Sequence, residues 1–323
     1  MPSDGYPGNV TNKHFSTAFL QRCLRSPACW GIALVQAVLW LVARLPIRVY
    51  PLLAHGLGRL FRVFGARRRH IAEVNLQLCF PEKNRDELIN LRNKHFTALG
   101  YGVIEAALGW WAHPTRLRRL GKVHGLEHLQ RVQAAGRGAI LLGAHYTTLE
   151  IGGTILGLVS PIPVRPTFRP HENAWLDYIV NRRRGVFLGP PIARDNIREM
   201  VRALRRQEIV WFAFDQNYGL KHSVFSPFFN VPAATNTALS RIVTLTHAAV
   251  LPYSSRRLDD GTYEIVIKPP LEDFPSADPQ ADTDRMNHII ETQVRIAPEQ
   301  YWWIHRRFKD RPPGQKDVYA PAD

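Results

Sequence analysis

The sequence predicts an α/β protein with a central, mostly parallel sheet flanked by helices. After Gly138, short apolar segments alternate with longer helix-like segments, which is the pattern of strands joined by helical crossovers. Polar clusters follow three of the apolar segments, as expected where the carboxyl ends of parallel strands border a ligand crevice. The chain has 323 residues, 45% of them hydrophobic, enough for one large domain with a substantial core.

The individual elements follow from apolar runs and their spacing. The predicted strands are residues 139–143, 164–168, 209–214, 248–253 and 263–267. The predicted helices between and after them are residues 147–157, 173–183, 196–206, 236–247 and 283–296, and residues 67–111 also have a helical pattern.

An N-terminal apolar segment, residues 28–43, is interrupted only by Gln36 and is bracketed by arginines on both sides. Its 16 residues span about 24 Å as a helix, less than the ~30 Å of a bilayer's hydrocarbon core. Snorkelling arginines and local thinning of the bilayer close this gap. We therefore predict a membrane-anchor helix, spanning or embedded; the alternative is a buried core helix. More arginines follow the segment than precede it, which favours a cytoplasmic location for the large domain.

The charge balance points to anionic partners. The chain carries 42 Lys and Arg against 27 Asp and Glu, a formal net charge of +15. Nucleic acid, acidic lipid head groups and an acidic carrier protein all fit this excess. The three cysteines, Cys23, Cys29 and Cys79, form no C-x-x-C pair, so neither a disulfide framework nor a metal site is expected. A serine hydrolase, a kinase and a nicotinamide enzyme are disfavoured because their glycine-rich or nucleophile motifs are missing.

The strongest candidate for chemistry is His145, directly after the apolar strand 139–143, with Glu150 five residues later. On one helix these two side chains would lie about 140° apart. If His145 lies on the turn and Glu150 on the first helical turn, the carboxylate can meet the imidazole. The histidine would then accept a proton from a substrate hydroxyl, while the glutamate orients the ring and stabilises the imidazolium. The alternative is a histidine that merely caps the next helix.

Two further polar clusters follow predicted strands. Arg169 comes after 164–168, and a cation there can stabilise an oxyanion or bind a phosphate; a plain surface arginine is the alternative. Asp215, Gln216 and Asn217 follow 209–214, where they either form a turn or share a pocket with His145. Residues 221–229 mix cations with aromatics, as a lipid-facing surface does. The aromatic and basic segment 298–308 predicts a membrane interface that binds phosphorylated lipid, or else a stacking platform for single-stranded nucleic acid.

Taken together and in order, several passages resemble one known family. They are residues 70–76, 79–81, 145–150, 168–171, 215–219, 223–225, 297–301 and 305–308. The chain resembles the bacterial lipid A biosynthesis late acyltransferases, the lauroyl/myristoyl group of the lysophospholipid acyltransferase-like superfamily. On this basis we divide it into a loose N-terminal tail (1–20), a membrane anchor and interfacial segment (21–66), an acyltransferase domain (67–313) and a C-terminal tail (314–323).

The resemblance implies a glycerolipid-acyltransferase-like fold at the cytoplasmic face of a bacterial inner membrane. It implies transfer of a laurate-type acyl chain from acyl carrier protein to a hydroxyl of a hydroxyacyl chain on a phosphorylated lipid A precursor. His145 would be the general base and Glu150 its partner, with Arg169 and the residues 215–217 binding substrate. Neither a covalent acyl-enzyme, a metal nor a cofactor beyond the acyl-carrier co-substrate is expected.

Two alternatives remain. One is a different lipid acyltransferase of the same fold. The other is a basic nucleic-acid-binding protein, which the 28–43 segment and the ordered motifs disfavour.

Overall fold

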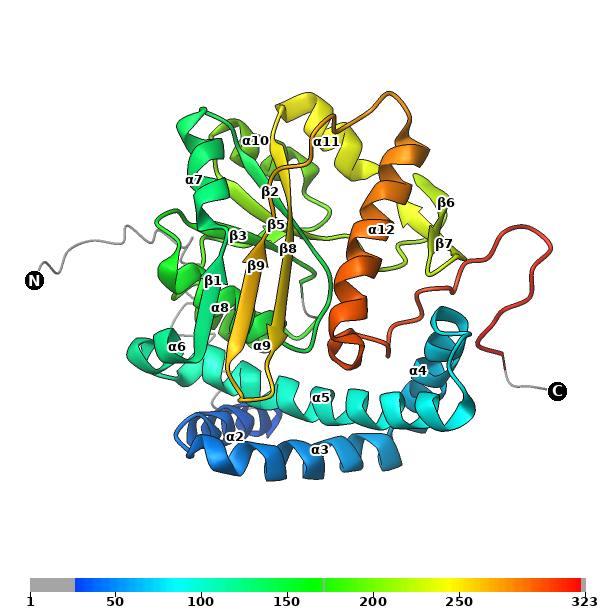
Figure 1. The fold of residues 1–323 in the computed structure, drawn as a ribbon. Helices are drawn as coiled ribbons and strands as arrows, with labels where there is room; N and C mark the ends of the chain where they lie inside the picture. The colour runs from blue at the N-terminus through cyan, green and yellow to red at the C-terminus, as the bar shows by residue number, and fades with distance from the viewer. Residues whose placement is uncertain (1–26, 171, 321–323) are drawn as a thin grey trace, which may run out of the picture.

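The computed structural model of the chain describes residues 27–170 and 172–320 (Figure 1). The predicted loose tail, residues 1–20, and the first six residues of the predicted anchor segment lie outside the described residues. The described C-terminal residues pack onto the domain: Tyr319 is buried, and its hydroxyl donates a 2.6 Å hydrogen bond to Asn75.

A seven-stranded sheet forms the centre of the domain, in the order β1-β9-β8-β2-β5-β3-β4. All neighbouring strands are parallel except β8 and β9, so the predicted mostly parallel sheet is confirmed. The strands are β1 (Gly121–His124), β2 (Ala139–Gly143), β3 (Val164–Phe168), β4 (Ile192–Ala193), β5 (Ile209–Ala213), β8 (Ala249–Arg257) and β9 (Tyr263–Ile267). Strands β6 (Ser223–Phe228) and β7 (Val231–Asn236) form a separate antiparallel hairpin.

Helices cover both faces of the sheet (Figure 1). They are α2 (Pro27–Val42), α3 (Tyr50–Phe64), α4 (Ala66–Cys79), α5 (Arg85–Trp111), α6 (Pro114–Leu120), α7 (Leu126–Ala134), α8 (Leu149–Val159), α9 (Ala174–Arg184), α10 (Ile197–Arg205), α11 (Ala238–Thr246) and α12 (Pro279–Ile296). The described residues also form two short 3-10 helices, η1 (Ile47–Val49) and η2 (Pro298–Gln300).

The core alternates along the central strand β2. Ile140 and Leu142 pack in the cluster that contains apolar residues of α10, α11 and α12. Ala139 and Leu141 pack in the second cluster, with residues of α5, α7 and α8. Because successive side chains of a strand point to opposite faces, an all-apolar strand must be covered on both sides. This burial explains why β2 lacks the polar alternation of a half-exposed strand.

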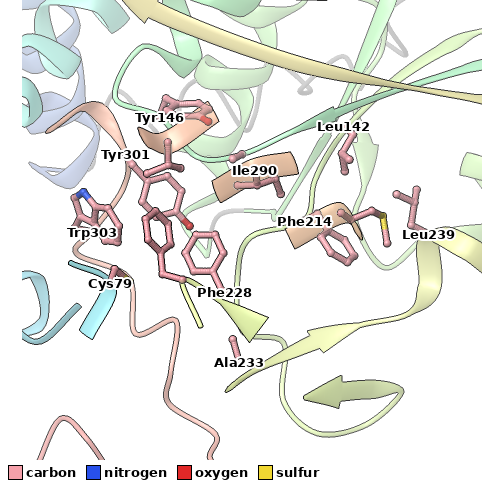
Figure 2. Packing of buried hydrophobic residues seen from close by; sticks show 14 of the residues in the cluster. Cys79, Leu142, Tyr146, Phe214, Phe228, Ala233, Leu239, Ile290, Tyr301 and Trp303 are labelled. Carbon is pink, nitrogen blue, oxygen red and sulfur yellow. The ribbon is translucent and has the colours of Figure 1, made fainter. Parts of the chain in front are cut away.

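The structure corrects two predicted surfaces. The segment 221–229 was expected to face lipid, yet Phe228 and Phe229 are buried between α4 and the C-terminal segment. The aromatics of 298–308 were expected at a membrane interface, but Phe308 is buried, and so are Tyr301 and Trp303, which Figure 2 shows in the core. These rings pack edge-on against one another, for example Tyr301 and Trp303 with centroids 4.7 Å apart, which is a core arrangement.

Helix α2 coincides with the predicted apolar helix, but it is not a buried core helix. Leu39 and Ala43 pack against α5, whereas Trp30, Leu34 and Leu41 are 63%, 67% and 56% exposed. Within residues 27–170 and 172–320, no single helix is long and apolar enough to cross a membrane. Residues 29–42 and 47–64 satisfy that test only as a pair bent by 114°, which is weak evidence for an anchor.

Helices α3 and α5 approach each other at glycines. A Cβ added at Gly100 of α5 would overlap the carbonyl oxygen of Ala54 and lie 2.9 Å from the backbone nitrogen of Gly58, both in α3. These are backbone atoms, so no side-chain rotation relieves the clash. The helix pair is therefore held at a distance that only glycine permits at this position.

We predict that Gly100→Ala lowers the free energy of unfolding by about 1–3 kcal/mol, because the added methyl group forces α3 and α5 apart. Chemical denaturation monitored by circular dichroism measures this change. Gly56→Ala is the matched control in α3: its Cβ would meet nothing within 4 Å. That substitution should instead stabilise the helix by about 0.5–1 kcal/mol. Equal effects of the two substitutions would contradict the close-approach argument.

Candidate active site

His145 and Asp215 form a hydrogen-bonded pair at the carboxyl edge of the sheet. Each residue lies two positions beyond the end of its strand, and Gly143 at the end of β2 is in register with Ala213 at the end of β5. Nδ1 of His145 lies 2.7 Å from Oδ1 of Asp215, and the backbone N–H of His145 donates a 2.9 Å hydrogen bond to Oδ2. One carboxylate thus fixes both the ring and the backbone of His145.

The ionised carboxylate of Asp215 determines which ring nitrogen of His145 carries the hydrogen. Burial raises the pKa of Asp215, but the charge of His145 and the hydrogen bonds from His145 and Tyr301 outweigh it and lower that pKa to about 2. An ionised carboxylate only accepts hydrogen bonds, so Nδ1 of His145 carries the hydrogen. In the neutral imidazole, Nε2 then holds the free lone pair that a general base needs.

The C-terminal segment holds the turn that carries His145. Trp302 N–H donates to the carbonyl oxygen of His145 (3.0 Å), and Thr147 N–H donates to the carbonyl oxygen of Gln300 (2.8 Å). Tyr146 and Tyr301 form an isolated β-bridge between these hydrogen bonds. Figure 2 shows the rings of Tyr146 and Tyr301 beside each other, with Trp303 close by. The aromatic motif near the end of the sequence therefore supports the site from inside the protein.

A large apolar cavity opens beside the histidine. Its volume is about 850 Å³, within the ~300–1,000 Å³ typical of small-molecule sites. Aliphatic and aromatic side chains of α2, α3 and α5 line it together with Trp302 and Ile304, and so do the polar residues His145, Thr147 and Glu150. We call this space the apolar cavity. Neither cysteine nor serine is among the described residues that line it.

The structure corrects the predicted pairing of His145 with Glu150. Glu150 lies on the first turn of α8 and lines the apolar cavity, as the sequence predicts. Its carboxylate, however, accepts hydrogen bonds from the guanidinium of Arg184 in α9 and from Nε1 of Trp110 in α5 (2.8 Å). The ring of His145 is instead held by Asp215, because the adjacent parallel strand ends beside it.

The remaining predicted site residues are placed as follows. Arg169 follows β3, which neighbours β5 at the same sheet edge, and its side chain is exposed outside the lining of the apolar cavity. Asn217 serves the turn: its side-chain oxygen accepts from Gly219 N–H at 3.0 Å. Gln216 is half-buried directly after Asp215. Binding roles for Arg169, Gln216 and Asn217 stay predictions.

Two residues at the site were missed or undervalued by sequence reasoning. Arg184 ends the run Arg182-Arg183-Arg184, and nothing local distinguishes the one arginine that faces a carboxylate. His305 accepts a 3.0 Å hydrogen bond from Asn217 N–H, and burial lowers its pKa to about 4. It is therefore neutral at pH 7, and its half-buried ring accepts a hydrogen bond that holds the turn after β5. Among the described residues, no group of three or more His, Cys, Asp or Glu is arranged to hold a metal ion.

Comparisons with known proteins agree with the resemblance seen in the sequence. The family model described as bacterial lipid A biosynthesis acyltransferase matches residues 17–310. The chain therefore belongs to this acyltransferase family.

Individual relatives are similar over nearly their whole length. The lipid A biosynthesis palmitoleoyltransferase of Escherichia coli (strain K12) is 38% identical over 307 residues, 94% of this chain and 98% of the relative. The lauroyltransferase of the same organism is also 38% identical, over 308 residues, with the same coverage. Its myristoyltransferase is 29% identical over 306 residues, 94% of both chains.

We predict that Asp215→Asn destabilises the protein by about 2 kcal/mol at neutral pH, since the folded-state pKa of about 2 lies below the ordinary value of 3.8. A group with a depressed pKa contributes stability above its unfolded pKa, and this contribution is lost as the pH falls. The difference in free energy of unfolding between wild type and Asp215→Asn should therefore be constant above about pH 5 and shrink towards pH 2. Urea titrations across this range measure it; a difference that grows on acidification would contradict the assignment.

Proposed function

We propose that this lipid A biosynthesis acyltransferase transfers a fatty acyl chain from acyl carrier protein to a hydroxyl of a hydroxyacyl chain on a phosphorylated lipid A precursor. The observation that carries the proposal is the His145–Asp215 pair beside the apolar cavity of about 850 Å³. The apolar cavity can hold an acyl chain, and His145 beside it can accept the proton of a hydroxyl group on that chain. The laurate-type chain length is part of the proposal and rests on the resemblance alone.

The reaction needs no covalent intermediate. Nε2 of His145 accepts the hydroxyl proton while the hydroxyl oxygen forms a bond to the thioester carbon. The tetrahedral oxyanion then collapses, the C–S bond breaks, and the departing thiolate takes the proton from the imidazolium. Asp215 is the positioning residue that stabilises the imidazolium in between. Thr147 is suited to donate to the oxyanion, since its buried hydroxyl has no partner among the described residues and lines the cavity.

Glu150 has a second role in this proposal. Its carboxylate is ion-paired with the mostly buried Arg184 and lies in the wall of the cavity that contains His145. From there it orients the attacking hydroxyl towards Nε2 of His145. Arg169, exposed beyond β3 at the same sheet edge, is suited to bind a substrate phosphate, and Gln216 a polar group of either substrate.

The net charge of the chain supports an acidic carrier protein as the acyl donor, and the exposed apolar residues of α2 and α3 support binding to a membrane. A carrier protein rich in acidic residues is attracted by a chain with a net charge of +15. The apolar residues exposed on α2 and α3 include Leu52 and Phe64, at 75% and 80%, and such a surface suits insertion into a bilayer. We propose that these helices bind the inner membrane, with the domain on its cytoplasmic side. Nucleic acid is not a partner in this proposal.

We predict that His145→Ala lowers turnover by about 10²–10⁴-fold and that Glu150→Ala reduces it severely, because the first loses the base and the second the hydroxyl's alignment. Transfer of radiolabelled laurate from acyl carrier protein to the phosphorylated lipid A precursor, resolved by thin-layer chromatography, measures this turnover. The exposed His288→Ala in α12 is the control and should keep wild-type turnover. Wild-type turnover in either site variant, with unchanged melting temperature, removes that residue from the mechanism.

We predict that the double variant Leu52→Glu/Phe64→Glu loses most of its binding to vesicles of phosphatidylethanolamine and phosphatidylglycerol. Charges on the proposed bilayer face carry a desolvation penalty on insertion. Vesicle flotation measures the bound fraction. The control is Leu245→Glu: Leu245 is 56% exposed on α11, and α11 lies at the opposite end of the molecule from α3 (Figure 1). Equal flotation of both variants would mean that α3 is not the membrane-binding element.

A further inference from the structure

A second cavity lies on the other side of α2 from the apolar cavity. Its volume is about 520 Å³, and it is formed by α2, the end of α5 and helix α9. Three indole rings line it, those of Trp40, Trp111 and Trp175, together with the guanidinium groups of Arg182 and Arg183. We call it the tryptophan cavity. None of these residues has a part in the acyl-transfer chemistry described above.

Within residues 27–170 and 172–320, neither arginine of this cavity forms an ion pair. The guanidinium carbon of Arg183 lies 3.4 Å from the ring centroid of Trp111, and Arg182 donates a 2.9 Å hydrogen bond to the hydroxyl of Tyr178. Among the described residues, no carboxylate lies within ion-pair distance of either, whereas the next residue, Arg184, is paired with Glu150. Arg182 and Arg183 thus keep charge and donors available for an anion.

Two buried polar atoms also lack partners in the described part of the chain. They are Oε1 of Gln36, whose side chain is only 8% exposed, and Nε1 of Trp111. Both residues line the tryptophan cavity. A buried polar atom without a hydrogen bond is energetically costly. A ligand that donates to Oε1 of Gln36 and accepts from Nε1 of Trp111 would remove this cost. Hydroxyl groups of a sugar meet this requirement, and indole rings pack against the apolar faces of sugar rings.

The two cavities are separated by one helix. In α2, Val35 and Leu39 line the apolar cavity, while Gln36 and Trp40 line the tryptophan cavity. The same division occurs at the end of α5, where Trp110 lines the first and Trp111 the second. An amphiphile that wraps around this edge can place acyl chains in one cavity and its polar head in the other.

We propose that the tryptophan cavity binds the phosphorylated sugar headgroup of the acceptor lipid, with Arg182 and Arg183 on a phosphomonoester and Gln36 and Trp111 on sugar hydroxyl groups. This inference rests on the proposed function, because it assigns the headgroup of that acceptor. It predicts that the cavity sets affinity for the acceptor, and that it contributes little to the rate once the acceptor is bound.

The test compares two acceptors, the phosphorylated lipid A precursor and the same lipid after phosphatase treatment, both in mixed micelles with acylated carrier protein as donor. Arg182→Gln/Arg183→Gln should raise KM for the phosphorylated acceptor about tenfold or more, with kcat and the KM for the donor unchanged. The dephosphorylated acceptor should show a high KM with wild type and no further increase with the variant. Arg198→Gln, an exposed arginine of α10, is the matched control.

Gln36→Leu supplies a second, stability-linked readout. If Gln36 binds the ligand, its replacement removes an unpartnered buried group, so the melting temperature stays the same or rises while KM for the acceptor rises several-fold. A fall in melting temperature with an unchanged KM would mean that Gln36 serves the fold alone.

The remaining outcomes separate this proposal from the proposed function. If the wild type transfers acyl chains normally and the arginine variants have an unchanged KM for the acceptor, the headgroup site alone is overturned. Wild type that acylates neither lipid overturns the proposed function itself. A raised KM for the acylated carrier protein, with the acceptor KM unchanged, would identify the arginines as a docking surface for the carrier and also overturn the headgroup site.

Discussion

The site depends on one carboxylate that makes two hydrogen bonds to one residue. Asp215 accepts from both the ring and the backbone N–H of His145, and this arrangement needs the ends of β2 and β5 in register. The sheet fixes that register, because the apolar residues of β2 must alternate between the two core layers. A slip of one residue would move each β2 side chain into the opposite core layer and separate His145 from Asp215. The strand register that packs the core is therefore the same register that brings His145 and Asp215 together.

Much of the fold and part of the site follow from local sequence patterns. Apolar runs predicted β2, β3 and β9 with the correct bounds, since both-face burial leaves a clear signal. The short strands β1 and β4 were missed, because four and two residues carry no periodicity. The turn position of His145 was predicted, but its partner was not, because Asp215 lies 70 residues away and only strand order brings the two together. Nor does composition separate a buried aromatic cluster from an interfacial one, which is why residues 298–308 were misassigned.

Helix α2 and the end of α5 separate the apolar cavity from the tryptophan cavity. One side of this boundary is apolar and leads to the imidazole, while the other presents indole rings and two arginines without a carboxylate partner in the described part of the chain. Tandem tryptophans account for this division: Trp110 donates to Glu150, and Trp111 faces Arg183. Adjacent positions near a helix end diverge by about 100°, so two neighbouring residues can serve two compartments. The arrangement matches the shape of a lipid whose chains and head diverge from a common backbone.

The hydrogen bonds from the His145 turn to Gln300 and Trp302 affect when this turn can form during synthesis of the chain. The turn is encoded near the middle of the chain, but the backbone that holds it is encoded near its end. While the ribosome is still adding the later helices, the sheet edge has already emerged without the strand-like segment that braces it. Until this last segment has been synthesised, the His145 turn therefore lacks the backbone hydrogen bonds that hold it in the finished protein.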